Sequence, residues 1–147
     1  MRPLGCLLLA ACALCSLTAC GKEVGRVSFS SEDTKRVEFA LRAGEVAFWT
    51  DLDLKYEGPA ELDYRVDLVQ SGRPVASAVC DPLGPKSTQI GWFELDRRGQ
   101  HVRSGKGKML CRASLAKGGP TTVEASLAFR TKPSAFRFGK ADLVLKQ

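Results

Sequence analysis

Residues 46–68 read VAFWTDLDLKYEGPAELDYRVDL, and this stretch decides the fold class. Apolar side chains recur at every second position on both sides of a short segment, 57–61, that contains Gly58 and Pro59. A period of two places alternate side chains on opposite faces of an extended chain, so that one face can be buried. Glycine and proline between two such runs mark a turn. The stretch therefore predicts two strands, 46–56 and 62–68, joined as a β-hairpin.

The same alternation continues in both directions from these two strands. No window of about a dozen residues has the 3.6-residue period of a helix. Segments rich in glycine and proline separate the alternating runs at regular intervals. The further strands are predicted at 27–29, 37–41, 75–80, 88–95, 109–115, 123–129 and 138–145. About 8–9 short strands of this kind predict an all-β chain folded as an antiparallel sandwich or barrel. Of the two we expect a β-sandwich, which forms a single domain over 25–147.

The first twenty residues have a different character from the rest of the chain. A positive start at Met1 and Arg2 precedes an apolar run over 4–14, and small residues follow before Cys20. This is the pattern of a secretory signal. As a helix the run is about 18 Å long, whereas a membrane's hydrocarbon core is about 30 Å thick, so a permanent transmembrane helix is not expected.

The segment Leu17-Thr18-Ala19-Cys20 resembles the lipobox of bacterial lipoproteins. The resemblance implies that the signal peptide 1–19 is removed by the lipoprotein signal peptidase, that Cys20 is acylated, and that 20–24 form a short tether. Two or more acyl chains anchor a protein stably in a membrane. In many lipoproteins of this kind, an aspartate directly after the acylated cysteine retains the protein at the inner membrane. Gly21 holds that position here. The resemblance therefore favours the outer membrane, with the domain facing the periplasm or the cell surface. The alternative is an ordinary secretory signal cut after Ala19.

Two cysteines, Cys80 and Cys111, remain in the predicted domain once Cys20 carries lipid. In an exported chain such a pair predicts one disulfide, which closes a loop of about 30 residues and stabilises the fold by about 3.5 kcal/mol. A redox or metal pair has little support, because the chain has no C-x-x-C motif. The spacing from Trp92 to Cys111 is too short for an immunoglobulin domain, so we expect the bridge to join neighbouring strands in another arrangement.

Charge is distributed unevenly along the chain. The formal net charge of +6 and the 44% of hydrophobic residues exclude a disordered tail and a polytopic membrane protein. Residues 20–83 carry 8 Lys and Arg against 12 Asp and Glu, whereas residues 84–147 carry 13 against 4, which predicts two regions of opposite charge. Asp51, Asp53, Asp63 and Asp67 are expected on one outer face. Such carboxylates are suitable ligands for a divalent cation, but they are also common on a solvent-exposed sheet face. The spacing of a calcium-binding loop is missing, so we expect no metal and no cofactor.

Two features are candidates for binding. The segment 97–108 is rich in glycine and cations and is predicted to be a mobile or hairpin-tip loop, which favours an anionic lipid, an acidic glycan or an acidic protein surface. The alternative is a charged loop that protects an edge strand from aggregation. Trp49 is out of phase with its apolar neighbours and is a candidate for stacking on a sugar or a partner, unless a bulge at Thr50 returns it to the core. The candidate binding residues are Trp49, Arg97, Arg98, Arg103, Lys106 and Lys108.

Catalytic residues are not expected. His101 is the only histidine and has no acid close to it in sequence, while Glu94 and Asp96 on one strand have no visible partner acid. We therefore expect a non-catalytic binding or accessory subunit, held at the membrane by its lipid, with an envelope protein as partner. A glycan- or anionic-ligand-binding module is the second alternative and an unrecognised hydrolase the third. The export signal argues against nucleic acid.

Overall fold

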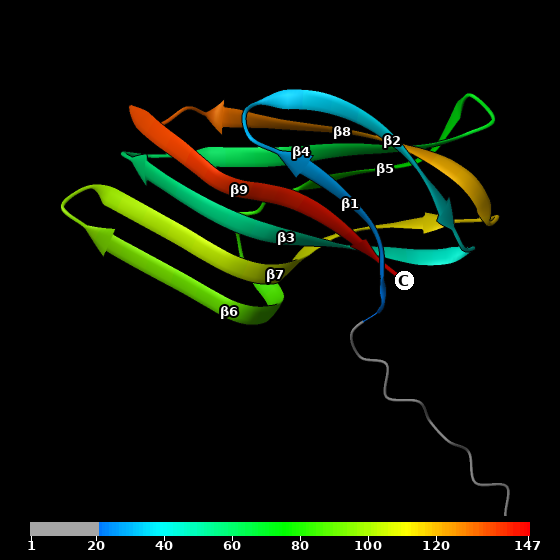
Figure 1. Ribbon diagram of the computed structural model, residues 1–147, viewed down its shortest axis with the longest axis horizontal. Coiled ribbons are helices and arrows are strands. Elements are labelled where there is room, and N and C mark those ends of the chain that lie inside the picture. The colour runs from blue at the N-terminus through cyan, green and yellow to red at the C-terminus, as the bar shows by residue number, and fades with distance from the viewer. Residues whose placement is uncertain (1–20) are drawn as a thin grey trace, which may run out of the picture.

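The computed structural model describes residues 21–147, and the signal peptide and Cys20 lie outside the described residues. In the described part the chain is all β, with each predicted strand present and no helix (Figure 1). The strands are β1 (Glu23–Phe29), β2 (Asp33–Leu41), β3 (Gly44–Glu57), β4 (Glu61–Gln70), β5 (Arg73–Cys80), β6 (Lys86–Arg97), β7 (Gln100–Leu115), β8 (Gly119–Thr131) and β9 (Ala135–Lys146).

The strands form two antiparallel sheets packed face to face, as the predicted β-sandwich requires (Figure 1). The five-stranded sheet has the order β1-β9-β3-β7-β6, and the four-stranded sheet has the order β2-β8-β4-β5. Side chains from alternate positions of both sheets fill the space between them. Among the largest fully buried side chains are Phe48, Leu52, Leu54, Leu62, Tyr64, Leu68, Leu127, Leu143 and Leu145.

The predicted hairpin between residues 46–56 and 62–68 is wrong. β3 pairs with β7 and β9, whereas β4 pairs with β5 and β8 in the opposite sheet. The segment 58–60 crosses from one sheet to the other, with Gly58 at a φ of +78°. The apolar faces of β3 and β4 therefore meet across the core. Alternation fixes which face of a strand is buried, but it does not fix which strand is its neighbour.

The segment 97–108 contains a hairpin tip, which was one of the two predictions for it, but most of it is strand and not a mobile loop. Only Arg98 and Gly99, both with positive φ, form the turn between β6 and β7. Gly105 and Gly107 lie inside β7, where a Cβ atom would come within 2.4 Å of the Gly91 carbonyl oxygen and 2.2 Å of Lys86 Cδ respectively. These glycines permit close packing against β6, so their abundance reflects strand packing and not a flexible loop.

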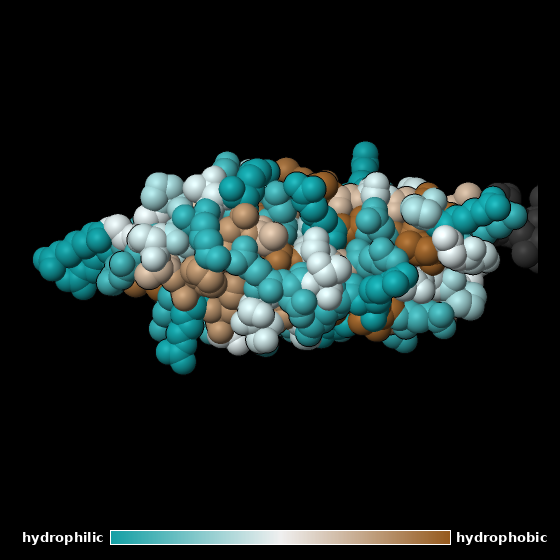
Figure 2. Space-filling model, turned by 90° about the horizontal axis from the view of Figure 1, so that it is seen from above, coloured by the Kyte–Doolittle hydropathy of each residue, from teal (hydrophilic) through white to brown (hydrophobic). Residues whose placement is uncertain are grey.

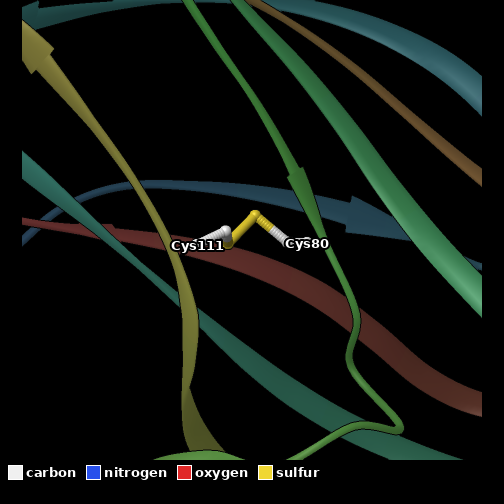
Figure 3. The surroundings of a disulfide bond; sticks show 2 residues. All are labelled: Cys80 and Cys111. Atoms are coloured by element: carbon white, nitrogen blue, oxygen red, sulfur yellow. A yellow bond between two sulfur atoms is a disulfide. The ribbon is translucent and has the colours of Figure 1, made fainter.

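The predicted disulfide between Cys80 and Cys111 is present, with Cα atoms 5.2 Å apart (Figure 3). It does not join neighbouring strands. Cys80 ends β5, an edge strand of the four-stranded sheet, and Cys111 lies in β7 of the five-stranded sheet. The bridge thus joins the two sheets where β5 packs on β7. Because the smaller sheet ends at β5, β6 extends beyond it at the lower edge of Figure 1.

The acidic and basic halves of the sequence do not form two regions of opposite charge. Strands from the first half alternate with strands from the second half in most of both sheets. Acids of one half therefore pair with bases of the other, as in Glu61 with Arg130 and Glu32 with Lys132. No helix in residues 21–147 is long and apolar enough to span a membrane. The side of the molecule where β2 and β8 lie is mainly hydrophilic, with small separate apolar groups (Figure 2).

Candidate binding face of the five-stranded sheet

An apolar row lies on the outer face of β6. Ile90, Phe93 and Leu95 are 51%, 53% and 47% exposed, and they stand opposite residues of β7 whose side chains also point outward. Most exposed apolar residues on a protein are isolated, but three in line along one strand form a continuous surface. We refer to Ile90, Phe93 and Leu95 as the β6 row.

A β-bulge produces the alignment of this row. The register between β6 and β7 shifts between Ile90 and Phe93, so two residues that are three positions apart point to the same face. Gly91 supplies the required φ of +60°. Opposite the bulge, Gly105 has a φ of +123° and lies too close to Gly91 and Trp92 to carry a side chain. The two glycines thus direct Ile90 outward, next to Phe93.

The bulge also directs Trp92 to the inner side of β6, where it packs against the edge of the core. Its ring lies under the Lys86 ammonium at 3.8 Å, and its Nε1 donates a hydrogen bond to Glu94 Oε1 at 2.8 Å. Burial lowers the pKa of Lys86. These contacts hold the overhanging strand in place without a second sheet beneath it.

β6 is also the last strand of its sheet. In the described part of the chain, backbone N–H and C=O groups along one of its sides have no partner strand. Natural edge strands are commonly shortened, charged or covered to prevent pairing with other chains. β6 extends over 12 residues and carries the apolar row in addition to a bulge and the charged residues Glu94, Asp96 and Arg97.

The centre of the same face holds a charged network. Asp51 of β3 stands opposite Asp142 of β9, and each residue is only 7% exposed. Arg26 of β1 joins them through Nη1, at 3.1 Å from Asp51 and 2.7 Å from Asp142. The hydrogen bonds that Arg26 donates to Glu23 and to these two carboxylates raise the pKa of Arg26, and the bonds to Glu23 lower the pKa of that residue. One guanidinium thus bridges two facing carboxylates, and Lys140 Nζ lies 3.6 Å from Asp51 as a second cation.

Trp49 points to this outer face, as its phase in the sequence predicts, but it is only 3% exposed. A register shift at Ala47 and Trp49 places its ring beside Val144, and the Lys146 ammonium lies over the ring at 3.9 Å. Lys146 and Val144 belong to β9, so the positions next to Trp49 in its own strand do not reveal these contacts. Trp49 is therefore not available to stack on a sugar.

The five predicted basic residues do not form one cluster. Lys106 and Lys108 point outward from β7, beside the β6 row and Trp49 respectively. Arg97 and Arg98 lie at the turn between β6 and β7. Arg103 faces the inner side, where Nη1 donates to Asp96 Oδ1 at 2.8 Å. The alternation of β7 separates Arg103 from the two lysines.

His101 has an acidic neighbour that its sequence context did not indicate. Its Nδ1 lies 2.5 Å from Asp96 Oδ1 across the β6–β7 turn, and its ring stacks on Tyr56 at 4.8 Å. Hydrogen bonds from Arg103 and His101 lower the pKa of Asp96. Tyr56 and His101 border an open cleft of about 330 Å³ that Phe136 also lines. Within residues 21–147 no hydroxyl or thiol is hydrogen-bonded to His101.

The acidic residues expected on one face lie on two opposite faces. Asp51 and Asp53 belong to the outer face of the five-stranded sheet, whereas Asp63 and Asp67 belong to that of the four-stranded sheet, because β3 and β4 are in different sheets. Asp63 lies 3.3 Å from Arg130. The described residues contain no group of three or more His, Cys, Asp or Glu side chains placed to hold a metal ion.

Comparisons with known proteins identify no relative. No protein-family model matches the chain, and no curated protein or solved structure is significantly similar to it. The function must therefore be inferred from the fold and from the chemistry of the surface.

Proposed function

We propose that this protein is a lipid-anchored accessory protein of the bacterial cell envelope, with no catalytic role, and that it binds a protein partner through the β6 row. The observation that carries the proposal is the alignment of Ile90, Phe93 and Leu95 on an uncovered edge strand. A bulge maintained by Gly91 and Gly105 is required to place all three on one face.

The energetics favour an occupant at this site. Full burial of a large apolar side chain contributes about 1.5–3 kcal/mol, so covering three that are half exposed contributes about 3 kcal/mol in total. The open edge of β6 adds backbone hydrogen bonds for a partner strand. Together these contributions suit a partner held by strand addition, with its apolar side chains on the β6 row.

The charges beside the row indicate the chemistry of the partner. Lys106 and Lys108 flank it on β7, and Arg97 and Arg98 lie at its end. None of these four side chains forms an ion pair within residues 21–147. A strand with alternating apolar residues and acidic flanks therefore complements the surface, and its charge would also accelerate association.

The position of Lys22 supports attachment to a membrane directly ahead of the domain. The Lys22 N–H donates to the Gln147 carbonyl at 2.9 Å, and the Gln147 N–H donates back at 3.1 Å. The folded domain thus begins two residues after Cys20. The β6–β7 turn lies at the opposite end of β3, whose 14 residues span about 45 Å. With a lipid on Cys20, the end of the β6 row lies away from the bilayer.

Photo-crosslinking in the protein's own cells tests the partner site. A photoreactive phenylalanine analogue replaces Phe93 in the full chain, and separately Glu94, which points to the other face of β6. A third variant carries it at Val79, an equally exposed apolar residue on the edge strand β5. We expect one adduct of discrete mass at Phe93 and none at Glu94 or Val79. In a Lys106→Glu, Lys108→Glu background the Phe93 adduct should decrease at least fivefold.

Three outcomes would contradict a protein partner of this chemistry. Equal adducts at Phe93 and Val79 would indicate nonspecific contact. An adduct of twice the protein's mass would indicate that the row binds a second copy of the chain. An adduct that is unaffected by the two lysine substitutions would exclude an acidic partner.

A further inference from the structure

Four cations from separate segments lie at the end of the sandwich that follows Cys20. Lys22 precedes β1, Arg42 lies between β2 and β3, Arg73 begins β5, and Lys117 lies between β7 and β8. They are up to 95 positions apart in sequence and share no motif. All four are exposed. We call these four residues the basic collar.

Gln147 connects the first two members of the collar through its backbone and its side chain. Lys22 pairs with Gln147 through two backbone hydrogen bonds. The side chain of Gln147 continues the connection, because its Nε2 donates to the Arg42 carbonyl and its Oε1 accepts from the Arg42 N–H, both at 2.8 Å. Lys22 and Arg42 are therefore held on either side of one glutamine.

A second glutamine connects the other two members. Gln70 Nε2 donates to the Lys117 carbonyl at 3.0 Å, and Gln70 is the register partner of Arg73 across the β4–β5 turn. Gly118 closes the ring, since a Cβ atom there would lie 3.1 Å from the Ala43 nitrogen, next to Arg42. The fold thus assembles the four cations around one end of the domain.

Within residues 21–147 the positive charges of the collar are not paired with acidic side chains. None of its side chains forms an ion pair within the described part of the chain. The nearby glutamates have partners of their own, Glu23 at 2.9 Å from Arg26 and Glu45 at 3.9 Å from Arg112. The end of the sandwich next to Cys20 therefore presents uncompensated positive charge.

We propose that the basic collar contacts anionic lipid headgroups of the bilayer in which Cys20 is anchored. The inference rests on the proposed membrane attachment and specifies how the domain sits there. A basic surface beside a lipid anchor supplies an additional signal for membrane binding. Each cation near an anionic bilayer strengthens binding severalfold, within a Debye length of about 10 Å. Lys22 meets that distance because only Gly21 separates it from Cys20, and Gln147 holds Arg42 beside Lys22.

Flotation of the unlipidated domain with vesicles tests the collar without the anchor. Residues 21–147 contain all nine strands, the hydrophobic core and the disulfide, so this part folds without the preceding segment. The collar variant carries Lys22→Gln, Arg42→Gln, Arg73→Gln and Lys117→Gln. The matched control carries Arg36→Gln, Lys55→Gln, Arg65→Gln and Arg137→Gln, which remove the same charge from the two outer faces of the sheets.

We expect the wild-type domain to float with phosphatidylglycerol-containing vesicles at low salt and not with pure phosphatidylcholine vesicles. The collar variant should bind at least tenfold more weakly, and the control less than threefold more weakly. Equal losses in both variants would overturn the collar in favour of general net charge, and so would wild-type binding that persists at about 0.5 M salt. Absence of wild-type binding would also overturn it. None of these results bears on acylation of Cys20, which this domain lacks.

Discussion

Arg26 is the residue on which the outer face of the five-stranded sheet most depends. Asp51 and Asp142 face each other at adjacent strand positions, nearly out of contact with water. Removal of the cation from a fully buried ion pair destabilises a protein by 3–5 kcal/mol, because the remaining charge is left uncompensated. The Arg26 side chain is 31% exposed, so water moderates that penalty.

We expect Arg26→Met to lower the free energy of unfolding by about 2 kcal/mol. Addition of Asp142→Asn should restore about 1 kcal/mol, because it removes one of the two facing carboxylates. Lys140→Met, which breaks only a 3.6 Å contact of a half-exposed lysine with Asp51, should cost less than about 0.5 kcal/mol. Urea denaturation measures all three. If the double variant is no more stable than Arg26→Met, carboxylate repulsion is not the cause.

Glu32 provides a pH-dependent contact between the β1–β2 loop and β8. Hydrogen bonds from Lys132 and from the Phe129 N–H lower its pKa below the ordinary value of 4.5. A carboxyl whose pKa is lower in the folded state than in the unfolded state stabilises the fold. The contribution is complete when the pH is above the pKa of the unfolded state, and it is lost as the pH falls through the pKa of the folded state. Glu32→Gln should therefore cost about 1 kcal/mol at pH 6 and much less at pH 3.

Thermal or urea unfolding at both pH values measures this difference. Glu38→Gln, at an exposed β2 position without an ion pair in the described residues, serves as the control and should have little effect at either pH. A cost for Glu32→Gln that is the same at pH 3 and pH 6 would show that the carboxylate charge does not contribute.

At the scale of the elements, the β6–β7 bulge controls the candidate site. Gly105→Ala would place a methyl group against the Gly91 carbonyl oxygen, and the resulting overpacking and backbone strain should cost about 2–4 kcal/mol. Gly72→Ala is the matched control, because Gly72 also has a positive φ but open space around it; it should cost about 1 kcal/mol. Equal costs would mean that the contact with Gly91 is unimportant. The Gly105 variant should also give a weaker Phe93 crosslink.

The strands themselves could be predicted from the sequence, because a period of two reports burial of one face directly. Their neighbours could not. The connection 58–60 allows either a hairpin or a crossing between sheets, and only the pairing of β3 with β7 and β9 decides between them. The β6 row could not be predicted for a related reason, because regular alternation places Ile90 and Phe93 on opposite faces and only the bulge brings them together. The predicted hairpin also placed Asp63 on the face of Asp51, whereas the two residues lie on different sheets.

At the scale of the whole molecule, the disulfide joins the two sheets. Cys80 and Cys111 are 31 residues apart, and a loop of that length corresponds to about 3.5 kcal/mol of stabilisation in the chain-entropy model. Cys80→Ala with Cys111→Ala should lower the free energy of unfolding by about this amount in urea, whereas reductant should not affect the variant further. A loss below about 1 kcal/mol would mean that the packing of β5 on β7 holds the sheets together without the bridge.

The proposed orientation of the molecule depends on Cys20. With acyl chains on that residue, the paired Lys22 and Gln147 place the basic collar against the bilayer and the β6–β7 turn on the far side. Without them, the sandwich is a secreted domain and the collar has no fixed membrane to contact. The lipid anchor therefore determines which end of the sandwich faces the bilayer.

The intact mass of the mature protein, purified from membranes of its own cells, shows whether Cys20 carries the lipid anchor. We expect a chain that begins at Cys20 and carries a diacylglyceryl group on the sulfur and an acyl chain on the amine, with Cys20→Ser abolishing both additions and the cleavage. A chain that begins at Cys20 with an unmodified thiol, or at any other residue, would contradict the account.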